Sequence, residues 1–320
     1  MSSDELRYLF ANNICSVVVF AIGLFGDILG LIVLSRKNLS KMNMINAYRC
    51  LLASDLLYFF TQVPIFNIMF SYPNIDPTAK SSWFCKLFNF SDYALFAPSP
   101  AIIIYFSVER LIATKFPAKR FLLKKDKVFF IYVGIVSLIS LIYFSPILFY
   151  YDLIETETIV DNATNATEIS VICNNASKVG TDVVYWLYLV ASAIVPYPLM
   201  VICTVLLMTT IYQSRLRTRT ESNISKIKRD LKLAITLIGF NLIYIICTLP
   251  VSLTAEGSVI DQFEIDVYLL ESWLFYASYG VNFYLLVATN ANIRNEFMLF
   301  IRIKRTNNQS INTFYYDCLN

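Results

Sequence analysis

The sequence contains no histidine, and only 15% of its 320 residues are charged. Without histidine the chain has no imidazole for general acid–base catalysis, for zinc binding or for a serine–histidine–aspartate triad. A Walker phosphate-binding loop and a GxGxxG dinucleotide motif are also absent. These absences argue against the commonest enzyme classes, so we expect no enzymatic activity, no catalytic residue and no organic cofactor.

Few residues are charged because most are apolar: hydrophobic residues make up 57% of the chain and give a mean hydropathy of +0.58. Soluble domains average about 25% charged residues. The apolar residues form seven runs near the ~20 residues that span a bilayer, at 14–34, 45–70, 84–112, 128–150, 183–212, 231–253 and 267–290. A β-barrel would show alternating segments of about ten residues instead. We therefore expect an all-α membrane protein with a bundle of seven transmembrane helices.

The distribution of basic residues predicts which side of the membrane each loop occupies. The loops after the first, third and fifth runs and the C-terminal segment are rich in lysine and arginine, whereas the opposite side carries only Arg7, Lys80, Lys86 and Lys178. The basic side is expected to be cytoplasmic, which places the N-terminus outside. The basic stretch 215–232 then faces the cytoplasm, and we expect no nucleic-acid partner for it.

The outer loop between the fourth and fifth runs carries signs of a secretory environment. Three N-x-S/T sequons predict glycosylation there, at Asn162, Asn165 and Asn175. Of the seven cysteines, only Cys85 and Cys173 lie on the oxidising outer side, and we expect them to form a disulfide rather than remain two free thiols. Four others lie inside apolar runs, where a thiol behaves as a small hydrophobe.

A set of motifs in fixed order resembles the rhodopsin-like (class A) G-protein-coupled receptors. LLASDLL around Asp55 resembles the family's LAxAD, and WFC ending at Cys85 is followed 25 residues later by Arg110, as in the family's WxFxC…[D/E]RY pattern. CTLP ending at Pro250 resembles CWxP, and the segment beginning at Asn282 resembles NPxxY. The following NANIRNEFMLF resembles the family's amphipathic cytoplasmic helix.

The resemblance implies an organisation and a signalling partner. It divides the chain into an extracellular segment (1–13), a receptor domain (14–290), an amphipathic helix (291–305) and a cytoplasmic tail (306–320). It also implies a plasma-membrane location, contact with lipids, an extracellular ligand and a heterotrimeric G protein inside. Glu109 would hold Arg110 while the cytoplasmic side is closed, and Pro250 and Asn282 would belong to the same activation switch. The simpler alternative for Arg110 is an interfacial arginine that reaches lipid phosphates.

Three carboxylates, those of Asp27, Asp55 and Asp92, lie inside apolar runs, where ionisable groups are functional candidates. The resemblance places Asp55 and Ser99 at the family's sodium site, and oxygen ligands suit a hard cation. The alternative is a protonated, hydrogen-bonded Asp55. Asp27 stands where the family has asparagine. It either shares a proton with Asp55 or, the simpler interpretation, replaces asparagine in neutral form.

The resemblance also points to a ligand site at the outer ends of the helices. Asp92 occupies the position that binds a cation in receptors for amines and for opioid-like and somatostatin-like peptides, and Tyr276 occupies that of a tyrosine that often contacts it. The outer loops are acidic, which steers cations toward the mouth. We therefore expect an extracellular ligand that is a short cationic peptide or a small cation.

Several positions depart from the family pattern. Thr248 stands where the family has tryptophan, and Phe283 and Leu286 replace the proline and tyrosine of NPxxY. These changes argue against an amine receptor proper, and the Asn-Phe pair is similar to that of some invertebrate neuropeptide receptors. Two alternatives remain: a chemosensory or amine receptor of the same fold, and a seven-helix transporter or channel. Broken helices and paired intramembrane charges would favour the transporter.

Overall fold

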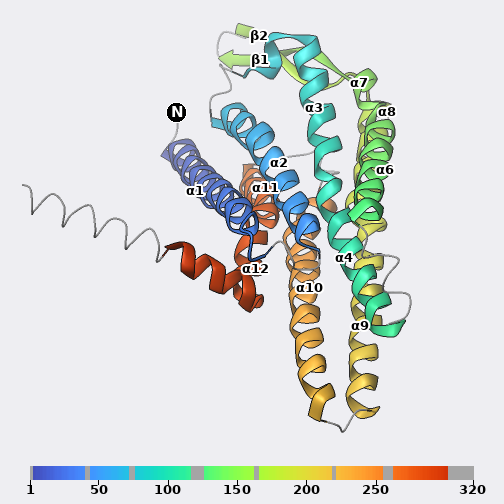
Figure 1. The fold of residues 1–320 in the computed structure, drawn as a ribbon. Helices are drawn as coiled ribbons and strands as arrows, with labels where there is room; N and C mark the ends of the chain where they lie inside the picture. Colours follow the sequence, from blue (N-terminus) through green and yellow to red (C-terminus); the bar gives the residue numbers. More distant parts are fainter. Residues whose placement is uncertain are drawn as a thin grey trace, which may run out of the picture.

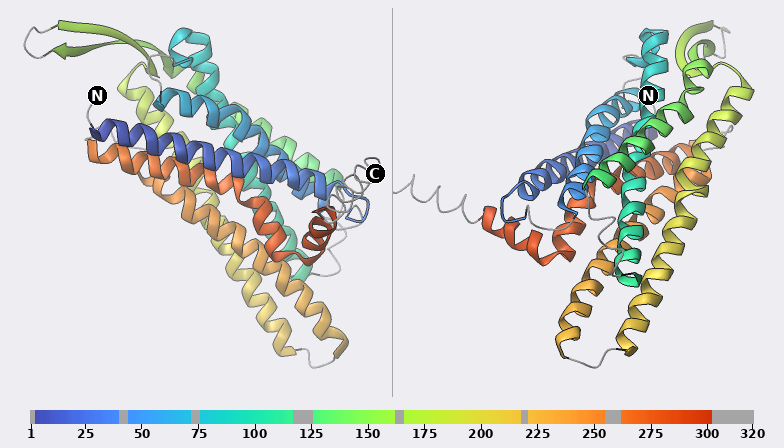
Figure 2. Two further views of the ribbon diagram at one scale, coloured as in Figure 1. Left: turned by 90° about the vertical axis from the view of Figure 1, so that its left-hand side faces the viewer. Right: turned by 45° about the vertical axis from the view of Figure 1, so that its right-hand side comes forward.

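The computed structural model describes residues 3–39, 44–71, 76–116, 126–161, 166–217, 221–254 and 262–301. These residues form a bundle of long helices with a two-stranded hairpin at one end (Figure 1). The N-terminus lies at the same end as the hairpin (Figures 1 and 2). At the opposite end, the fifth and sixth spans extend beyond the other helices (Figure 1).

The first two spans and the last two contain long helices. They are α1 (Ser3–Leu34), α2 (Ile45–Ser71), α10 (Glu221–Thr254), α11 (Gln262–Gly280) and α12 (Asn282–Thr289), and residues 291–301 form a further helix. The helix in α1 already begins at Ser3, within the segment assigned from the sequence to an extracellular N-terminal region before the first span. That extension is helical and continues directly into the first span.

The third, fourth and fifth spans are interrupted. They comprise α3 (Ser82–Phe96) with α4 (Pro98–Lys115), α6 (Asp126–Phe144) with α7 (Ile147–Tyr150), and α8 (Lys178–Leu189), the π-helix η4 (Val190–Ile194) and α9 (Pro196–Arg217). A short 3₁₀ turn, η2 (Thr78–Lys80), precedes α3. The sequence-based runs gave these spans in the right places but did not reveal the breaks.

Within the described residues, six helical segments are long and apolar enough to cross a membrane, and the last two helices, α11 and α12, are not among them. α11 carries the carboxylates of Glu264, Asp266 and Glu271, which lower its hydropathy. It nevertheless packs against α1 and α10 and completes the predicted bundle. The contact with α1 is close: a Cβ on Gly280 would lie 2.7 Å from the Cα of Gly23, so small residues let the two backbones approach.

Prolines cause two of the breaks, and hydroxyl groups from neighbouring helices compensate for them. Proline has no N–H, so the carbonyl four residues earlier loses its helical donor. Pro98 releases the carbonyl of Ala94, which accepts a 3.0 Å hydrogen bond from Ser140 Oγ of α6. In lipid such a carbonyl must find another donor, and this serine supplies it.

The same compensation recurs at two further prolines. Pro100 releases the carbonyl of Phe96, which accepts a 3.4 Å hydrogen bond from the Tyr279 hydroxyl of α11. Pro196 releases the carbonyl of Ser192 in the π-helix, to which the Tyr244 hydroxyl of α10 donates at 3.5 Å. The break in the third span is therefore tied to neighbouring helices by Ser140 and Tyr279, and the break in the fifth span is tied to α10 by Tyr244.

The long outer loop folds into an antiparallel hairpin of β1 (Tyr151–Asp161) and β2 (Ala166–Asn175), which was not predicted from the sequence. The expected disulfide is present: Cys85 of α3 is bonded to Cys173 of β2, with 5.6 Å between the Cα atoms. A second tie lies beside it. Asp152 of β1 accepts a 2.6 Å hydrogen bond from Ser82 Oγ and lies 3.0 Å from Lys86 Nζ.

This second tie lies outside the membrane-spanning segments and affects proton binding. The hydrogen bonds from Ser82, from Lys86 and from the amide of Leu153 lower the pKa of Asp152 from 3.8 to about 2. The carboxylate therefore stays ionised, and paired with Lys86, throughout the physiological pH range. The disulfide and this ion pair together hold the hairpin on the outer end of α3.

Candidate functional site

The extracellular half of the bundle places Asp92 among aromatic side chains. Asp92 lies on α3 two turns below Cys85, is partly buried, and accepts a 2.8 Å hydrogen bond from the Tyr58 hydroxyl of α2. Among the residues that the structure describes, no lysine or arginine forms an ion pair with it. The arrangement leaves a carboxylate that is oriented by a tyrosine and has its charge available for a cation.

Tyr276 belongs to the cluster of aromatic rings that includes Tyr58, the hydrogen-bond partner of Asp92. Its ring centroid is 6.0 Å from that of Tyr58, 5.1 Å from Phe66 and 5.6 Å from Trp273. The sequence predicted Tyr276 as the partner of Asp92 and missed Tyr58, which makes the hydroxyl contact to the carboxylate. One signal was available: Tyr58 lies one helical turn beyond Asp55 and therefore shares its inward face.

A second polar group lies deeper in the bundle. Asp55 is fully buried and accepts a 2.7 Å hydrogen bond from Asn282 Nδ2 of α12, and Ser99 of α4 lies beside the same carboxylate. The predicted pair of Asp55 and Ser99 is therefore brought together, with Asn282 as a third member. The oxygen atoms of a carboxylate and a hydroxyl are the ligands that a hard cation prefers, so the residues fit a sodium ion.

Asp27 of α1 is the unusual member of this region. Its side chain is 0% exposed, and among the described residues neither of its carboxylate oxygens has a hydrogen-bond partner; the same holds for Oδ1 of Asp55. A buried carboxylate without a partner is costly unless it is protonated or meets a cation. The structure thus retains both interpretations of Asp27 that the sequence offered.

Hydroxyl groups occupy the place where the family pattern has an aromatic switch. Thr248 of α10 is fully buried and shares a 2.9 Å hydrogen bond with the Tyr197 hydroxyl of α9. Tyr197 and Ser192 each lie 3.3 Å from Ser252 Oγ, one turn beyond Thr248. Pro250 lies between these two α10 residues. This hydroxyl cluster connects the break in the fifth span to the proline of the sixth.

At the cytoplasmic end, Glu109 and Arg110 form an ion pair. Arg110 Nε lies 3.2 Å from Glu109 Oε2, and the two residues are 7% and 2% exposed. The guanidinium also donates to Sδ of Met44, at the start of α2, over 3.4 Å. The sequence predicted this contact between neighbouring residues, and the burial explains why a charge pair is needed: an unpaired arginine here would be costly.

One polar contact in the cytoplasmic half was not foreseen. Asn241 of α10 donates from Nδ2 to Thr204 Oγ1 of α9 at 2.8 Å and to Ser107 Oγ of α4 at 3.3 Å. Asn241 is 3% exposed, and it lies two turns before Thr248 on the same helix. Three helices that surround the cytoplasmic core are thus joined by one amide.

Charged groups attach the helix at 291–301 to the bundle. Glu296 lies 3.5 Å from Arg36 Nε and accepts a 2.8 Å hydrogen bond from Asn38. Ile293 is fully buried, and the Phe297 ring lies 5.7 Å from that of Phe283. One face of this helix therefore packs against the bundle, as expected of the predicted amphipathic helix.

Some predicted sites cannot be placed. Asn162 and Asn165 and the tail 306–320 lie outside the described residues. Asn175 ends β2, and its Oδ1 atom is buried. Its use as a glycan acceptor stays a prediction.

The broken helices invite a comparison with transporters, in which unwound backbone carbonyls coordinate ions. Here the carbonyls that Pro98, Pro100 and Pro196 release are hydrogen-bonded by hydroxyl groups of adjacent helices. They are therefore engaged in holding the bundle together, which removes the main structural argument for ion transport.

Comparison with known families agrees with this organisation. A family profile described as "7 transmembrane receptor (rhodopsin family)" matches residues 27–282, which is most of the chain. No curated protein matches the chain at a significant level. The matched region contains the Asp55, Glu109–Arg110 and Pro250 motifs and ends at Asn282. The chain therefore belongs to the rhodopsin family of seven-transmembrane receptors, and it is a multi-pass membrane receptor that signals through G proteins rather than an enzyme.

Proposed function

We propose that the chain is a plasma-membrane receptor for a short cationic peptide, most similar in its ligand class to invertebrate neuropeptide receptors. The observation that carries the proposal is Asp92: a partly buried carboxylate, oriented by Tyr58, in the extracellular half of the bundle. A guanidinium or ammonium group of a ligand would complete this site, because desolvated charge-assisted hydrogen bonds are strong and directional. The aromatic rings around Tyr276 would pack against the rest of the ligand.

The route from this site to the cytoplasm is proposed to run through the hydroxyl cluster. A ligand that displaces Tyr58 or Tyr276 would shift α11 and α10, and α10 carries both Thr248 and Asn241. An outward movement of α10 would break the Asn241 contacts and free Arg110 from Glu109. The ligand needs only to bind the open state more tightly than the closed one, since this is a shift of populations.

The buried Asp55 is proposed to hold a sodium ion with Ser99 in the closed state, and Asp27 to be its neutral neighbour. We expect sodium to raise the melting temperature of the purified receptor, and Asp55→Asn to remove this effect. Asp27→Asn should leave it unchanged, because asparagine is neutral as well. Loss of the sodium effect in Asp27→Asn would show instead that Asp27 is ionised and contributes to the site.

The ligand proposal can be tested in cells that express the receptor, with calcium and cAMP as readouts. Pooled amidated basic peptides and pooled biogenic amines would be applied to wild type and to Asp92→Asn. We expect a peptide response whose potency falls about 100-fold in Asp92→Asn, the size typical of removing one partner of a desolvated charge pair. Tyr58→Phe should lower potency about tenfold, since it removes one hydrogen bond to a charged group.

Two controls distinguish a specific contact at Asp92 from a general effect of the negative charge on the outer surface. Glu155→Gln removes the same charge from the exposed outer hairpin and should leave potency nearly unchanged. Arg110→Ala should abolish signalling while leaving peptide binding intact. A peptide response that Asp92→Asn does not weaken would overturn the assignment of the site. A response to the amine pool alone would overturn the peptide in favour of an amine.

A further inference from the structure

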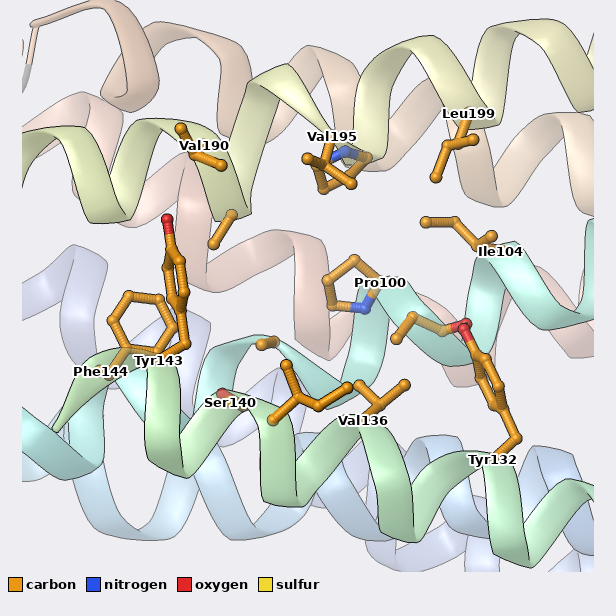
Figure 3. Close-up of a pocket in the computed structure, with 15 residues that line it drawn as sticks. Pro100, Ile104, Tyr132, Val136, Ser140, Tyr143, Phe144, Val190, Val195 and Leu199 are labelled. Carbon is orange, nitrogen blue, oxygen red and sulfur yellow. The ribbon is translucent and has the colours of Figure 1, made fainter.

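A hollow of about 300 Å³ lies on the side of the bundle, between the breaks in the third and fifth spans and the fourth span. We call it the lateral groove. Pro100 and Ile104 of α4 lie on one side, Val136 and Ser140 of α6 on another, and Leu199 of α9 on the third (Figure 3). The groove therefore lies at the point where two interrupted helices face each other.

The lining of the lateral groove is apolar. None of the residues that line it is charged. Two of its polar groups are already engaged, because Ser140 Oγ donates to the carbonyl of Ala94 and the Tyr132 hydroxyl donates to that of Ala101, each at 3.0 Å. The Tyr143 side chain points across the groove toward Val190 (Figure 3). This lining suits a hydrocarbon chain as the occupant.

The lateral groove opens toward the bilayer rather than toward water. Ile139 of α6 and Val195, next to α9, line it and are 58% and 49% exposed. Both belong to segments that are long and apolar enough to cross the membrane, Asp126–Tyr150 and Lys178–Gln213. Their exposed surface therefore meets lipid chains, and the groove is reached sideways from the hydrocarbon region.

A second hollow of about 330 Å³ continues the lateral groove toward the extracellular side. The two hollows share Tyr143 and Val190. The rest of the second hollow is lined by one face of α8, with residues at helical spacing: Val179, Asp182, Val183, Trp186 and Leu187. Asp182 is exposed near the outer end of α8, and Trp186 lies one turn further in and is 58% exposed. Apolar lining thus gives way to a carboxylate and an indole at the membrane surface.

We propose that the two hollows together form an intramembrane binding site for a phospholipid with a choline headgroup. One acyl chain fills the lateral groove, and the trimethylammonium group lies between the carboxylate of Asp182 and the ring of Trp186. A quaternary ammonium is attracted to an aromatic face and to a carboxylate but needs no hydrogen-bond acceptor.

A lipid in the lateral groove would affect the stability of the receptor, because the helix breaks form part of the walls of the groove. Ser140 lines the groove and also holds the released carbonyl of Ala94, so an acyl chain in the groove packs against the side chain that bridges α6 and α3. The bound lipid would therefore support the bundle where Ser140 joins α6 to α3. This inference is independent of the peptide ligand, since it concerns the outer face of the bundle and not the Asp92 site.

The test uses the full receptor in nanodiscs and a phosphatidylcholine that carries a photoreactive diazirine in one acyl chain. Labelled residues are mapped by mass spectrometry. We expect Ile104, Val136 and Leu199 to be labelled several-fold more than Ile22 and Phe25, which are exposed on α1. Ala101→Trp, which fills the groove from α4, should lower the groove labelling to the level of α1.

Ile142→Trp is the matched control, because Ile142 lies on α6, is 64% exposed and does not line either hollow. It should leave the labelling pattern unchanged. Ala191→Phe fills the groove from the opposite wall and should reproduce the effect of Ala101→Trp, which guards against a folding defect in one variant. Labelling of the groove at the level of α1 in the wild type would mean annular lipid only and would overturn the site.

The headgroup is tested by competition with unlabelled lipids that share acyl chains. Phosphatidylcholine should compete better than phosphatidylglycerol in the wild type, and Asp182→Asn should reduce this preference about threefold, as expected for an exposed cation contact. An unchanged preference in Asp182→Asn would overturn the headgroup assignment. Stronger labelling by a photoreactive sterol than by phosphatidylcholine would overturn the phospholipid as occupant.

Discussion

The two halves of the bundle are stabilised by different chemistry. In the extracellular half, most of the buried hydrophobic residues are aromatic, and the helices are interrupted at prolines whose released carbonyls depend on single hydroxyl groups. In the cytoplasmic half, the buried residues are largely aliphatic. There the polar contacts include two charged pairs, Glu109–Arg110 and Arg36–Glu296, beside the neutral contacts of Asn241.

The difference follows from what each half contains. The outer half holds the proposed ligand site, where rings and hydroxyls provide many weak contacts that a ligand can replace one at a time. The inner half holds a buried charge pair, which is either formed or broken, because an unpaired charge in an apolar environment is costly. Ligand contacts in the outer half can be replaced one at a time, whereas the charge pair in the inner half has only two states. Together they allow ligand binding to shift the receptor from a closed to an open state.

The largest expected effect comes from breaking the buried charge pair in the inner half. Glu109→Gln leaves Arg110 without its carboxylate and should destabilise the closed receptor by about 3 kcal/mol. Because the open state exposes Arg110 to the cytoplasm and loses less, nucleotide exchange on a purified G protein without agonist should rise. The rise can be measured with reconstituted receptor and a fluorescent guanine nucleotide.

Glu296→Gln is the matched control for this prediction. It removes a carboxylate from another arginine pair on the same side, that of Arg36, but in the helix at 291–301. We expect a small loss of stability and no rise in basal exchange. If both variants raised exchange equally, the switch could not be assigned to the pair at Arg110.

The next largest effect should come from the outer hairpin. Cys173→Ser removes the bond to Cys85, which closes a separation of 88 residues, and should lower stability by about 2–4 kcal/mol. Surface expression and the melting temperature in detergent would measure this. Cys203→Ser, at a buried cysteine outside any disulfide, is the control. An equal loss in the control would contradict a special role for the hairpin.

A smaller effect tests the proline-released carbonyls of the outer half. Ser140→Ala leaves the carbonyl of Ala94 without a donor in lipid and should cost about 1–3 kcal/mol. Ser54→Ala is the control, since Ser54 Oγ donates to the Leu51 carbonyl of its own helix. The melting temperature in detergent should fall clearly more for Ser140→Ala than for Ser54→Ala.

Restoring the backbone donor sharpens this prediction. In Pro98→Ala/Ser140→Ala, the new amide at position 98 can donate to the carbonyl of Ala94, so the double variant should melt above Ser140→Ala alone. If the double variant lost as much stability as the two single variants added together, the new amide would not have replaced the lost hydrogen bond. The helix break at Pro98 itself would then determine stability.

The smallest effect concerns pH and the exposed ion pair of the hairpin. The pKa of Asp152 is about 2, below its ordinary value of 3.8, because Ser82, Lys86 and the amide of Leu153 favour the ionised carboxylate. A depressed pKa stabilises the fold fully above pH 4, and this contribution is lost as the pH falls toward 2. The melting temperature of wild type minus that of Asp152→Asn should therefore be constant from pH 7 to 5 and shrink below pH 4.

High salt should reduce the same difference at neutral pH, since exposed pairs are screened. A difference that grew on acidification would contradict the assignment of the shift to these donors.

Several features of the molecule could be predicted from the sequence because they depend on local chemistry. Hydropathy placed the spans, since about 20 apolar residues cross a bilayer whatever their neighbours are. The position of two cysteines on the predicted outer side predicted the bond between Cys85 and Cys173. The resemblance to the receptor family, carried by the spacing from Cys85 to Arg110, predicted the contact of Glu109 with Arg110.

Other features depended on partners that are distant in the chain. The breaks at Pro98 and Pro196 are tolerated only because Ser140 and Tyr244 come from other helices, and no local pattern announces those donors. Tyr58 was missed as the partner of Asp92 because the contact joins two helices whose relative rotation is set by packing. The same holds for Asn241 with Thr204.

The sequence by itself thus determined that the chain lies in a membrane, the number of its spans and the identity of its buried charges, because these follow from the transfer of each residue between water and lipid. The tertiary structure decided which hydroxyl meets which carbonyl and which tyrosine orients Asp92. It also decided that α11 joins the bundle in spite of its carboxylates. These outcomes depend on how the helices rotate and approach one another, and that is set by the packing of all helices together.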